Sequence, residues 1–178
     1  MHTEKIKKAF LYYAAIGWSV IPLCSHDHSH MSDRHIVTCK NPGKSPLISG
    51  WPSSDVPSRD TIEGWCKQWP TLNIGLVLGE PSGIIAIDVD GEKGFELLEE
   101  LSAGDVPTTL QFSTPGGGMR YLFRNPYPEK AHKFQLTFPE LAHNECSLLG
   151  DGCQTVLPPS VHQNGGVYKW IHQPHRQS

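Results

Sequence analysis

An apolar run that ends in two aspartates limits what this chain can fold into. The run reads Ile84-Ile-Ala-Ile-Asp88-Val-Asp90-Gly91, and its apolar stretch is typical of a buried β-strand. Side chains at positions i and i+2 lie on one face of a strand, so Asp88 and Asp90 are expected to point the same way. Two carboxylates held this close favour a cation between them, and oxygen ligands suit Mg²⁺ or Mn²⁺. The alternative is a plain strand end followed by an Asp-Gly turn.

The segments around this strand mix helices with short strands. The predicted helices span 3–16, 60–69 and 91–101, and the predicted strands span 18–23, 73–78, 84–90, 110–114, 119–123, 146–149, 154–157 and 167–170. Thr3 is expected to cap the first helix, and Asp60 to open a capping box at the second. Phe95, Leu98 and Leu101 are expected to face the core from the third.

The order of these elements indicates an α+β fold, because regular alternation of strand, helix and strand is absent. Residues 24–57 show no helical or strand period and are expected to form a long loop, whose His- and Cys-rich part spans 24–46. We find no internal repeat and no stretch typical of a linker. Residues 1–178 are therefore expected to form a single domain.

The charge and the cysteine content exclude some classes of function and favour one kind of compartment. The net charge of −3 excludes a generally basic nucleic-acid coat, so contact with DNA or RNA must depend on a local patch. No stretch reaches the roughly 20 apolar residues of a membrane span, so no membrane partner is expected. Five cysteines cannot all pair within one chain, which favours a reducing compartment and a cytoplasmic location.

Seven short blocks along the chain have the order and spacing of one known family. They are Pro46-Leu-Ile-Ser-Gly-Trp51, Asn73-Ile-Gly-Leu-Val-Leu-Gly79, Ile87-Asp-Val-Asp-Gly91, Pro107-Thr108, Thr114-Pro-Gly-Gly-Gly118, Pro158-Pro-Ser-Val-His162 and Gly166-Val-Tyr-Lys-Trp170. Taken together, they resemble the bifunctional DNA primase/polymerase N-terminal (prim-pol) domain of the archaeo-eukaryotic primase superfamily. The resemblance covers the chain from Tyr13 to Trp170.

The resemblance implies an archaeo-eukaryotic primase-type fold, with a modified RNA-recognition-like mixed sheet flanked by helices. It also implies template-directed nucleotide addition by a DNA primase and polymerase of a plasmid, phage or mobile-element replication protein. The implied partners are nucleoside triphosphates, a DNA template and primer, and a helicase of the same replication system. In the family the two acids of the Asp-x-Asp block ligate two catalytic Mg²⁺ or Mn²⁺ ions, so Asp88 and Asp90 would do so here.

Two positions depart from the family pattern. Arg120 stands where the family has a histidine that contacts nucleotide phosphates; arginine can grip a phosphate but cannot shuttle a proton. The family's third acidic position falls on Ser147, and Glu145, two residues earlier on the same strand face, is the alternative third ligand. These departures weaken the expected activity. They leave open a degenerate prim-pol domain that acts as a nucleotide- or nucleic-acid-binding module of a replication initiator.

Four further positions are candidates for nucleotide binding. They are Lys44 in the segment Asn41-Pro-Gly-Lys-Ser-Pro46, Thr114, Ser160 and His162. The resemblance implies that Ser160 and His162 lie near the nucleotide. For Lys44 the alternative is a solvated loop lysine, and for His162 it is a structural histidine.

The loop after the first predicted strand carries a second possible metal site. Four of the ten histidines fall between positions 26 and 35, and His35-x-x-x-Cys39 has the spacing of half a zinc finger. The best four-ligand set for Zn²⁺ is Cys24, His28, His35 and Cys39, with His26 and His30 as substitutes for His28. A polar, His-rich surface loop without metal is the alternative.

Overall fold

The computed structural model describes residues 2–126, 134–137 and 144–175. The helices are α1 (His2–Ala15), α2 (Asp33–Thr38), α3 (Arg59–Gln68) and α4 (Gly91–Leu101), and a short 3₁₀ helix spans Trp51–Ser53. The strands are β1 (Val20–Leu23), β2 (Asn73–Val77), β3 (Ile84–Asp90), β4 (Leu110–Ser113), β5 (Met119–Arg124), β6 (Phe134–Thr137), β7 (Glu145–Leu149), β8 (Gln154–Val156) and β9 (Lys169–His172). The fold is therefore α+β, as the order of elements predicts.

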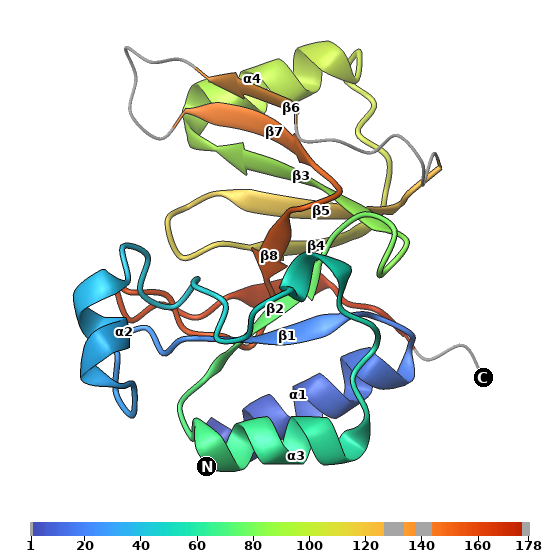
Figure 1. The fold of residues 1–178 in the computed structure, drawn as a ribbon. Coiled ribbons are helices and arrows are strands. Elements are labelled where there is room, and N and C mark those ends of the chain that lie inside the picture. The colour runs from blue at the N-terminus through green and yellow to red at the C-terminus, as the bar shows by residue number, and fades with distance from the viewer. Residues whose placement is uncertain (1, 127–133, 138–143, 176–178) are drawn as a thin grey trace.

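The described strands form two sheets. The smaller sheet has the order β1-β2-β8, and the larger one has the order β6-β7-β3-β5-β4-β9. In Figure 1, α1 and α3 lie below the smaller sheet and α4 lies above the larger one. Every pairing between these strands is antiparallel, so the expected mixed sheet is replaced by antiparallel ones.

The main core lies where α1 and α3 cover the smaller sheet. Ile6 and Phe10 of α1 are fully buried, and all five residues of β2 are buried. A strand that is buried on both faces reads as a continuous apolar run, which explains the segment Ile74 to Leu78. Among the described helices, none is long and apolar enough to cross a bilayer.

Several local predictions are wrong, for identifiable reasons. The expected loop 24–57 contains α2, which buries none of its residues and so leaves no apolar period to detect. Ser58 caps α3 in place of Asp60, because its hydroxyl accepts a hydrogen bond from the backbone N–H of Thr61. Thr3 lies inside α1 and donates to the carbonyl of Pro70, and Leu101 is 64% exposed at the end of α4.

The elements next to the acidic pair agree closely with the sequence. Helix α4 and strand β3 have the predicted bounds, and β4 and β5 pair as the predicted hairpin. The strand β6 was not predicted; it extends the larger sheet beyond β7. Because β3 lies inside this sheet, between β5 and β7, residues from both neighbours flank its two aspartates.

Candidate active site

The antiparallel register around β3 determines which side chains meet the two aspartates. Asp88 lies opposite Arg120 of β5 on one side and opposite Ser147 of β7 on the other. Asp90 lies opposite Glu145 of β7. Residues directly opposite each other on adjacent strands share a face of the sheet, with Cβ atoms about 5 Å apart. The sheet therefore gathers three carboxylates and one guanidinium on one face.

The three carboxylates form a compact cluster. Asp88, Asp90 and Glu145 each offer an oxygen, and these oxygens lie within 4.8 Å of one another. All three residues are partly buried, so water screens their mutual repulsion less than on an open surface. Three hard oxygen donors at this spacing fit a divalent cation such as Mg²⁺ or Mn²⁺. The cluster thus has the donor chemistry that the Asp-x-Asp pattern predicts.

The two alternatives for the third acidic position differ in their surroundings. The Glu145 carboxylate is part of the cluster, whereas Ser147 is 2% exposed and sits deeper on β7. The Ser147 hydroxyl has no hydrogen-bond partner within the described residues. Glu145 is the better ligand on this geometry, because it brings a charged oxygen to the same point as both aspartates.

Arg120 provides the positive charge nearest to the cluster. Its guanidinium forms an ion pair with the Asp88 carboxylate, and the side chains are only 12% and 14% exposed. Burial lowers the pKa of Arg120 to about 10. The guanidinium therefore remains charged at neutral pH. Arg120 therefore offsets part of the negative charge that Asp88, Asp90 and Glu145 bring together.

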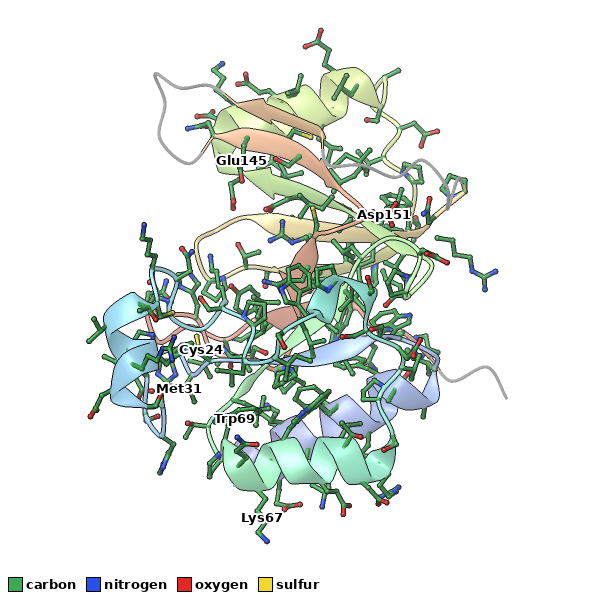
Figure 2. All side chains as sticks on the ribbon, in the orientation of Figure 1. Cys24, Met31, Lys67, Trp69, Glu145 and Asp151 are labelled. Carbon is green, nitrogen blue, oxygen red and sulfur yellow. The ribbon has the colours of Figure 1, made fainter. Side chains whose placement is uncertain are left out.

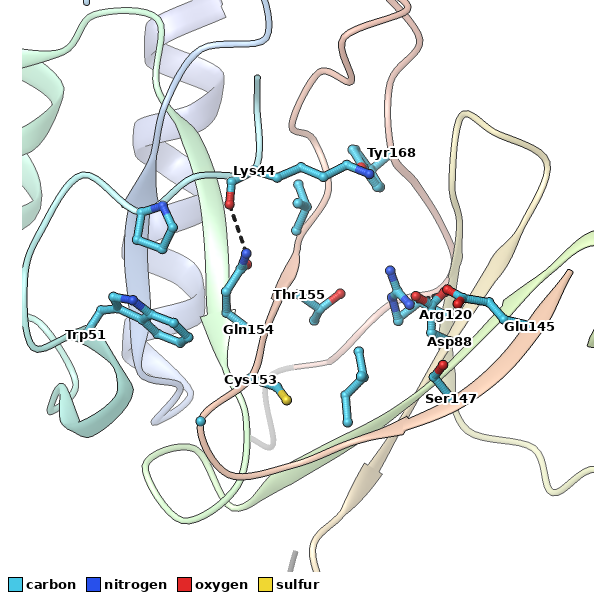
Figure 3. Close-up of a pocket in the computed structure, with 14 residues that line it drawn as sticks. Lys44, Trp51, Asp88, Arg120, Glu145, Ser147, Cys153, Gln154, Thr155 and Tyr168 are labelled. Atoms are coloured by element: carbon cyan, nitrogen blue, oxygen red, sulfur yellow. Dashed lines mark hydrogen bonds and ion pairs between the residues drawn. The ribbon is translucent and has the colours of Figure 1, made fainter. Parts of the chain in front are cut away.

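The cluster opens into two adjoining cavities of about 1000 Å³ and about 380 Å³. Both are lined by Lys44, Asp88, Arg120, Glu145 and Tyr168. Figure 3 shows Arg120, Asp88 and Glu145 side by side, with the Lys44 side chain extending toward Tyr168. The larger cavity has the size of a typical site for a small ligand such as a nucleotide.

Lys44 approaches the cluster from the loop that follows α2. Its backbone carbonyl accepts a hydrogen bond of 2.9 Å from the Nε2 of Gln154, which ties this loop to β8. Partial desolvation lowers the pKa of Lys44 and the charge of Arg120 lowers it further, while Asp90 and Glu145 oppose the shift. The ammonium group therefore shares the electrostatic field of the cluster.

Thr114 and Gly118 shape the turn between β4 and β5. The backbone N–H of Thr114 donates to the Gly118 carbonyl, and the Thr114 hydroxyl accepts from the Gly118 N–H. A Cβ at position 118 would collide with an Asp90 carboxylate oxygen and lie 2.6 Å from the Val89 carbonyl. Only glycine leaves room for the Asp90 side chain at this point. Thr114 also lines the larger cavity.

The two candidates after the Pro158-Pro159 turn lie in different environments. His162 lines the larger cavity, with its ring centroid 6.1 Å from that of Tyr168. Ser160 is fully buried, and its hydroxyl accepts a hydrogen bond of 2.9 Å from the backbone N–H of Ile74. This hydroxyl fastens the turn to β2, and Ser160 lines neither of the two cavities. A contact between Ser160 and nucleotide therefore stays a prediction from the sequence.

Tyr168 is a site residue that was not singled out from the sequence. It is 4% exposed and lines both cavities. Burial raises the pKa of Tyr168 to about 12, with a smaller opposing effect from Arg120, so the phenol is neutral at ordinary pH. The sequence signal for Tyr168 is its place in the block Gly166-Val-Tyr-Lys-Trp170.

The structure also brings together the four candidate zinc ligands. One ligand atom each from Cys24, His28, His35 and Cys39 lies within 4.8 Å of the other three. Neither of the proposed substitutes, His26 and His30, belongs to this group. Figure 2 shows Cys24 beside α2, well separated from Glu145 on β7. The two candidate metal sites are thus distinct.

Comparison with known proteins adds one finding to this geometry. A family model described as "Bifunctional DNA primase/polymerase, N-terminal" matches residues 10–178. A search of curated proteins returns no match.

Proposed function

Because the chain belongs to the family of bifunctional DNA primase/polymerase N-terminal domains, we propose that it adds nucleotides to a primer on a DNA template. The observation that carries this proposal is the cluster of Asp88, Asp90 and Glu145, whose oxygens lie within 4.8 Å of one another.

The family membership supports a primase-type fold in which residues 1–178 act as one domain. It also supports a role in the replication protein of a plasmid, phage or mobile element, alongside a helicase. The odd number of cysteines favours the cytoplasm as the compartment.

In this function the three carboxylates would hold two divalent ions, Mg²⁺ or Mn²⁺. Bound there, the ions supply positive charge that offsets the triphosphate and lowers the pKa of the attacking primer hydroxyl. Asp88 and Asp90 hold their oxygens on the rigid strand β3, and Glu145 adds its oxygen from β7. This arrangement fixes the donors before substrate arrives.

Arg120 and Lys44 would bind the phosphate oxygens of the incoming nucleotide. Arg120 presents a planar fork of N–H donors, which matches phosphate geometry, and Lys44 adds a second cation in the same cavity. In the structure the Arg120 guanidinium forms an ion pair with Asp88. Entry of the nucleotide and its metals would therefore exchange this ion pair for a contact between Arg120 and phosphate. His162 and Thr114 line the same cavity and are candidates for contact with the sugar or base.

The ion pair between Arg120 and Asp88 favours a second candidate function. A buried guanidinium on Asp88 competes with a divalent ion for that carboxylate. In this alternative the domain binds nucleotide or nucleic acid for a replication initiator but polymerises poorly.

Primer extension and primer synthesis with Mg²⁺ or Mn²⁺ test the proposal. The wild type is expected to extend a primer, and Asp88→Ala and Asp90→Ala to lose activity by about 10²-fold or more, since each removes a metal ligand. Asp60→Asn, an exposed carboxylate on α3, is the matched control and is expected to retain activity. Nucleotide binding without primer extension would support the binding module. A protein that neither binds nucleotide nor extends a primer would contradict both proposed functions.

A further inference from the structure

The loop between β1 and Lys44 brings two thiols and two imidazoles to one point. Cys24 follows the last residue of β1 and is fully buried; His28 lies in the next turn; His35 and Cys39 lie on α2 and at its C-terminal cap. The two cysteines stand at the ends of a 16-residue stretch, Cys24 to Cys39, and the two histidines lie within it. The four ligand atoms nevertheless lie within 4.8 Å of one another.

The sulfur separation matches a shared metal ion better than a disulfide. The Sγ atoms of Cys24 and Cys39 lie 3.9 Å apart, whereas a disulfide requires about 2.05 Å. Two thiolates bound at about 2.3 Å to a tetrahedral zinc ion are about 3.8 Å apart. The two thiols are thus already placed as neighbouring ligands of a tetrahedral ion.

The two imidazoles contribute a second, independent observation. The Nε2 atoms of His28 and His35 are both buried from solvent and have no hydrogen-bond partner within the described residues. Their rings stand edge to face, with centroids 5.5 Å apart. Buried polar nitrogens are normally hydrogen-bonded or bound to a metal, so a pair without partners points to an ion between them. Neutral imidazole nitrogen and thiolate sulfur are the ligands that zinc prefers.

One backbone contact near the cluster favours a thiolate at Cys24. The backbone N–H of Gly43 donates to the Cys24 sulfur at 3.3 Å, a contact that stabilises negative charge on sulfur. The Cys39 thiol donates to the hydroxyl of Ser45 at 3.1 Å, which ties the residue after Lys44 to this cysteine. His28 adopts a left-handed backbone conformation with φ of 60°, which is uncommon for a residue other than glycine. The loop thus holds this ring in place against a local conformational preference.

We propose that Cys24, His28, His35 and Cys39 bind one structural zinc ion, which fixes the loop that carries Lys44 at the nucleotide cavity. Four protein ligands fill a tetrahedral site and leave no open position, so the ion is structural. Lys44 is five residues beyond Cys39, and Gly43 and Ser45 on either side of it contact the two cysteines. Loss of zinc would therefore loosen Lys44 as well as α2. The second half of this proposal rests on the proposed function, whereas the zinc site does not.

Metal content tests the site directly. Wild-type protein purified without a histidine tag is expected to carry about one equivalent of zinc, and its cobalt form to show the visible absorption of a tetrahedral thiolate site. Cys39→Ser and His35→Gln are expected to lose at least 10-fold in zinc affinity. The matched control His30→Gln, a histidine of the same loop outside the cluster, is expected to keep its zinc. Zinc-free wild type with free thiols, a Cys24–Cys39 disulfide, or retention of zinc by both cluster variants would overturn the site.

Nucleotide binding tests the link to Lys44. Removing zinc by chelation from the wild type, with circular dichroism checking that the fold persists, is expected to weaken nucleotide binding several-fold. The same treatment is expected to change little in Lys44→Ala, because the affected contact is already absent. Equal weakening in both proteins would overturn the link. If the wild type holds zinc but binds no nucleotide, the proposed function fails and the zinc site stands.

Discussion

At the scale of single residues, Glu145 completes the carboxylate cluster from a neighbouring strand. Glu145→Gln keeps the size of the side chain but removes its charge, so we expect a loss of about 10²- to 10³-fold in the extension rate. Ser147→Ala is expected to leave the rate close to that of the wild type, because its buried hydroxyl has no partner within the described residues to lose. Primer extension at saturating nucleotide measures both. A severe loss in Ser147→Ala with an active Glu145→Gln would reverse the assignment.

Arg120 is expected to limit the affinity of the cluster for divalent ions. Arg120→His restores the residue of the family pattern and frees Asp88 from the guanidinium, so Mn²⁺ affinity and extension rate should both rise. Nucleotide affinity should change only modestly, because Lys44 remains in the cavity. Mn²⁺ titration and primer extension provide the measurements, with Arg124→His on the same strand as control. Unchanged Mn²⁺ affinity would show that Arg120 does not compete with the metal.

Gly118 provides the space in which the Asp90 carboxylate lies. Gly118→Ala is expected to displace Asp90, because the new methyl group would overlap its carboxylate oxygen and approach the Val89 carbonyl to 2.6 Å. We expect a loss of extension activity of about 10²-fold, similar to the loss of a metal ligand. Gly116→Ala is the control in the same turn, since its Cβ would meet no atom within 4 Å. Equal activity of the two variants would contradict this account.

Residue patterns predicted part of this site. The period of a strand was enough to place Asp88 and Asp90 on one face, because that relation is local. The choice between Glu145 and Ser147 and the contact of Arg120 with Asp88 depend on how β5 and β7 align with β3. Register across strands is a tertiary property, and one sequence does not determine it.

At the scale of elements, Tyr13 joins α1 to two segments near the C-terminal end. Its hydroxyl donates to the Pro158 carbonyl at 2.6 Å and accepts from the Nε1 of Trp170 at 2.8 Å. Its ring stacks on Trp18 with centroids 5.5 Å apart. Tyr13→Phe keeps the stacking but removes the partner of the buried Pro158 carbonyl and of the partly buried Trp170 N–H, so we expect about 1–3 kcal/mol less free energy of unfolding. Urea unfolding measures the difference.

The same tyrosine is expected to contribute to alkaline unfolding. Burial raises the pKa of Tyr13 above its ordinary value of 10.0, so the folded state retains the proton while the unfolded chain loses it. This contribution to stability is complete below pH 10 and decreases as the pH rises beyond it. Between pH 9 and pH 11 the Tm of the wild type should therefore fall more steeply than that of Tyr13→Phe. Parallel curves would contradict the assignment to Tyr13.

Elements with a strong local pattern were the ones that the sequence predicted well. Helix α4 has Gly91 directly after the acidic pair and a buried Leu98 on one face, and its bounds agree with the prediction. Helix α2 has six residues and no buried side chain, so nothing in its sequence distinguished it from a loop. Ser58 and Asp60 are both good caps, and only the folded geometry selects Ser58 at α3.

At the scale of the whole molecule, the carboxylate cluster is expected to cost stability unless a divalent ion is bound. Its members come from two strands, so an ion bound to the folded state alone shifts the unfolding equilibrium. Mn²⁺ at 100 times its dissociation constant should add about 2.7 kcal/mol, or about 5–10 °C in Tm. The measurement uses protein already loaded with zinc, so that Mn²⁺ binding at Cys24, His28, His35 and Cys39 does not contribute to the shift in Tm. A double Asp88→Ala/Asp90→Ala variant should show no shift, and an equal shift in it would place the ion elsewhere.

The division into two sheets was the largest feature that the sequence did not reveal. Strands β2 and β3 are consecutive in the chain and separated by a short turn, yet they belong to different sheets. Strands β7 and β8 likewise lie in different sheets, across the segment Gly150 to Cys153. Alternating apolar residues show which segments are strands, but the partner of each strand depends on long-range contacts.

The order of strands in the two sheets has a consequence for the chain during its synthesis. In the smaller sheet the early strand β2 pairs with β8, which comes much later in the chain. In the larger sheet the early strand β3 pairs with the late strand β7. A ribosome adding 5–20 residues per second needs about 3–11 s to proceed from Asp90 to Glu145. Throughout that interval β2 lacks its partner β8 and β3 lacks its partner β7, and the third carboxylate has not yet been synthesised. The nascent chain therefore acquires the complete carboxylate cluster only late in the translation of this domain.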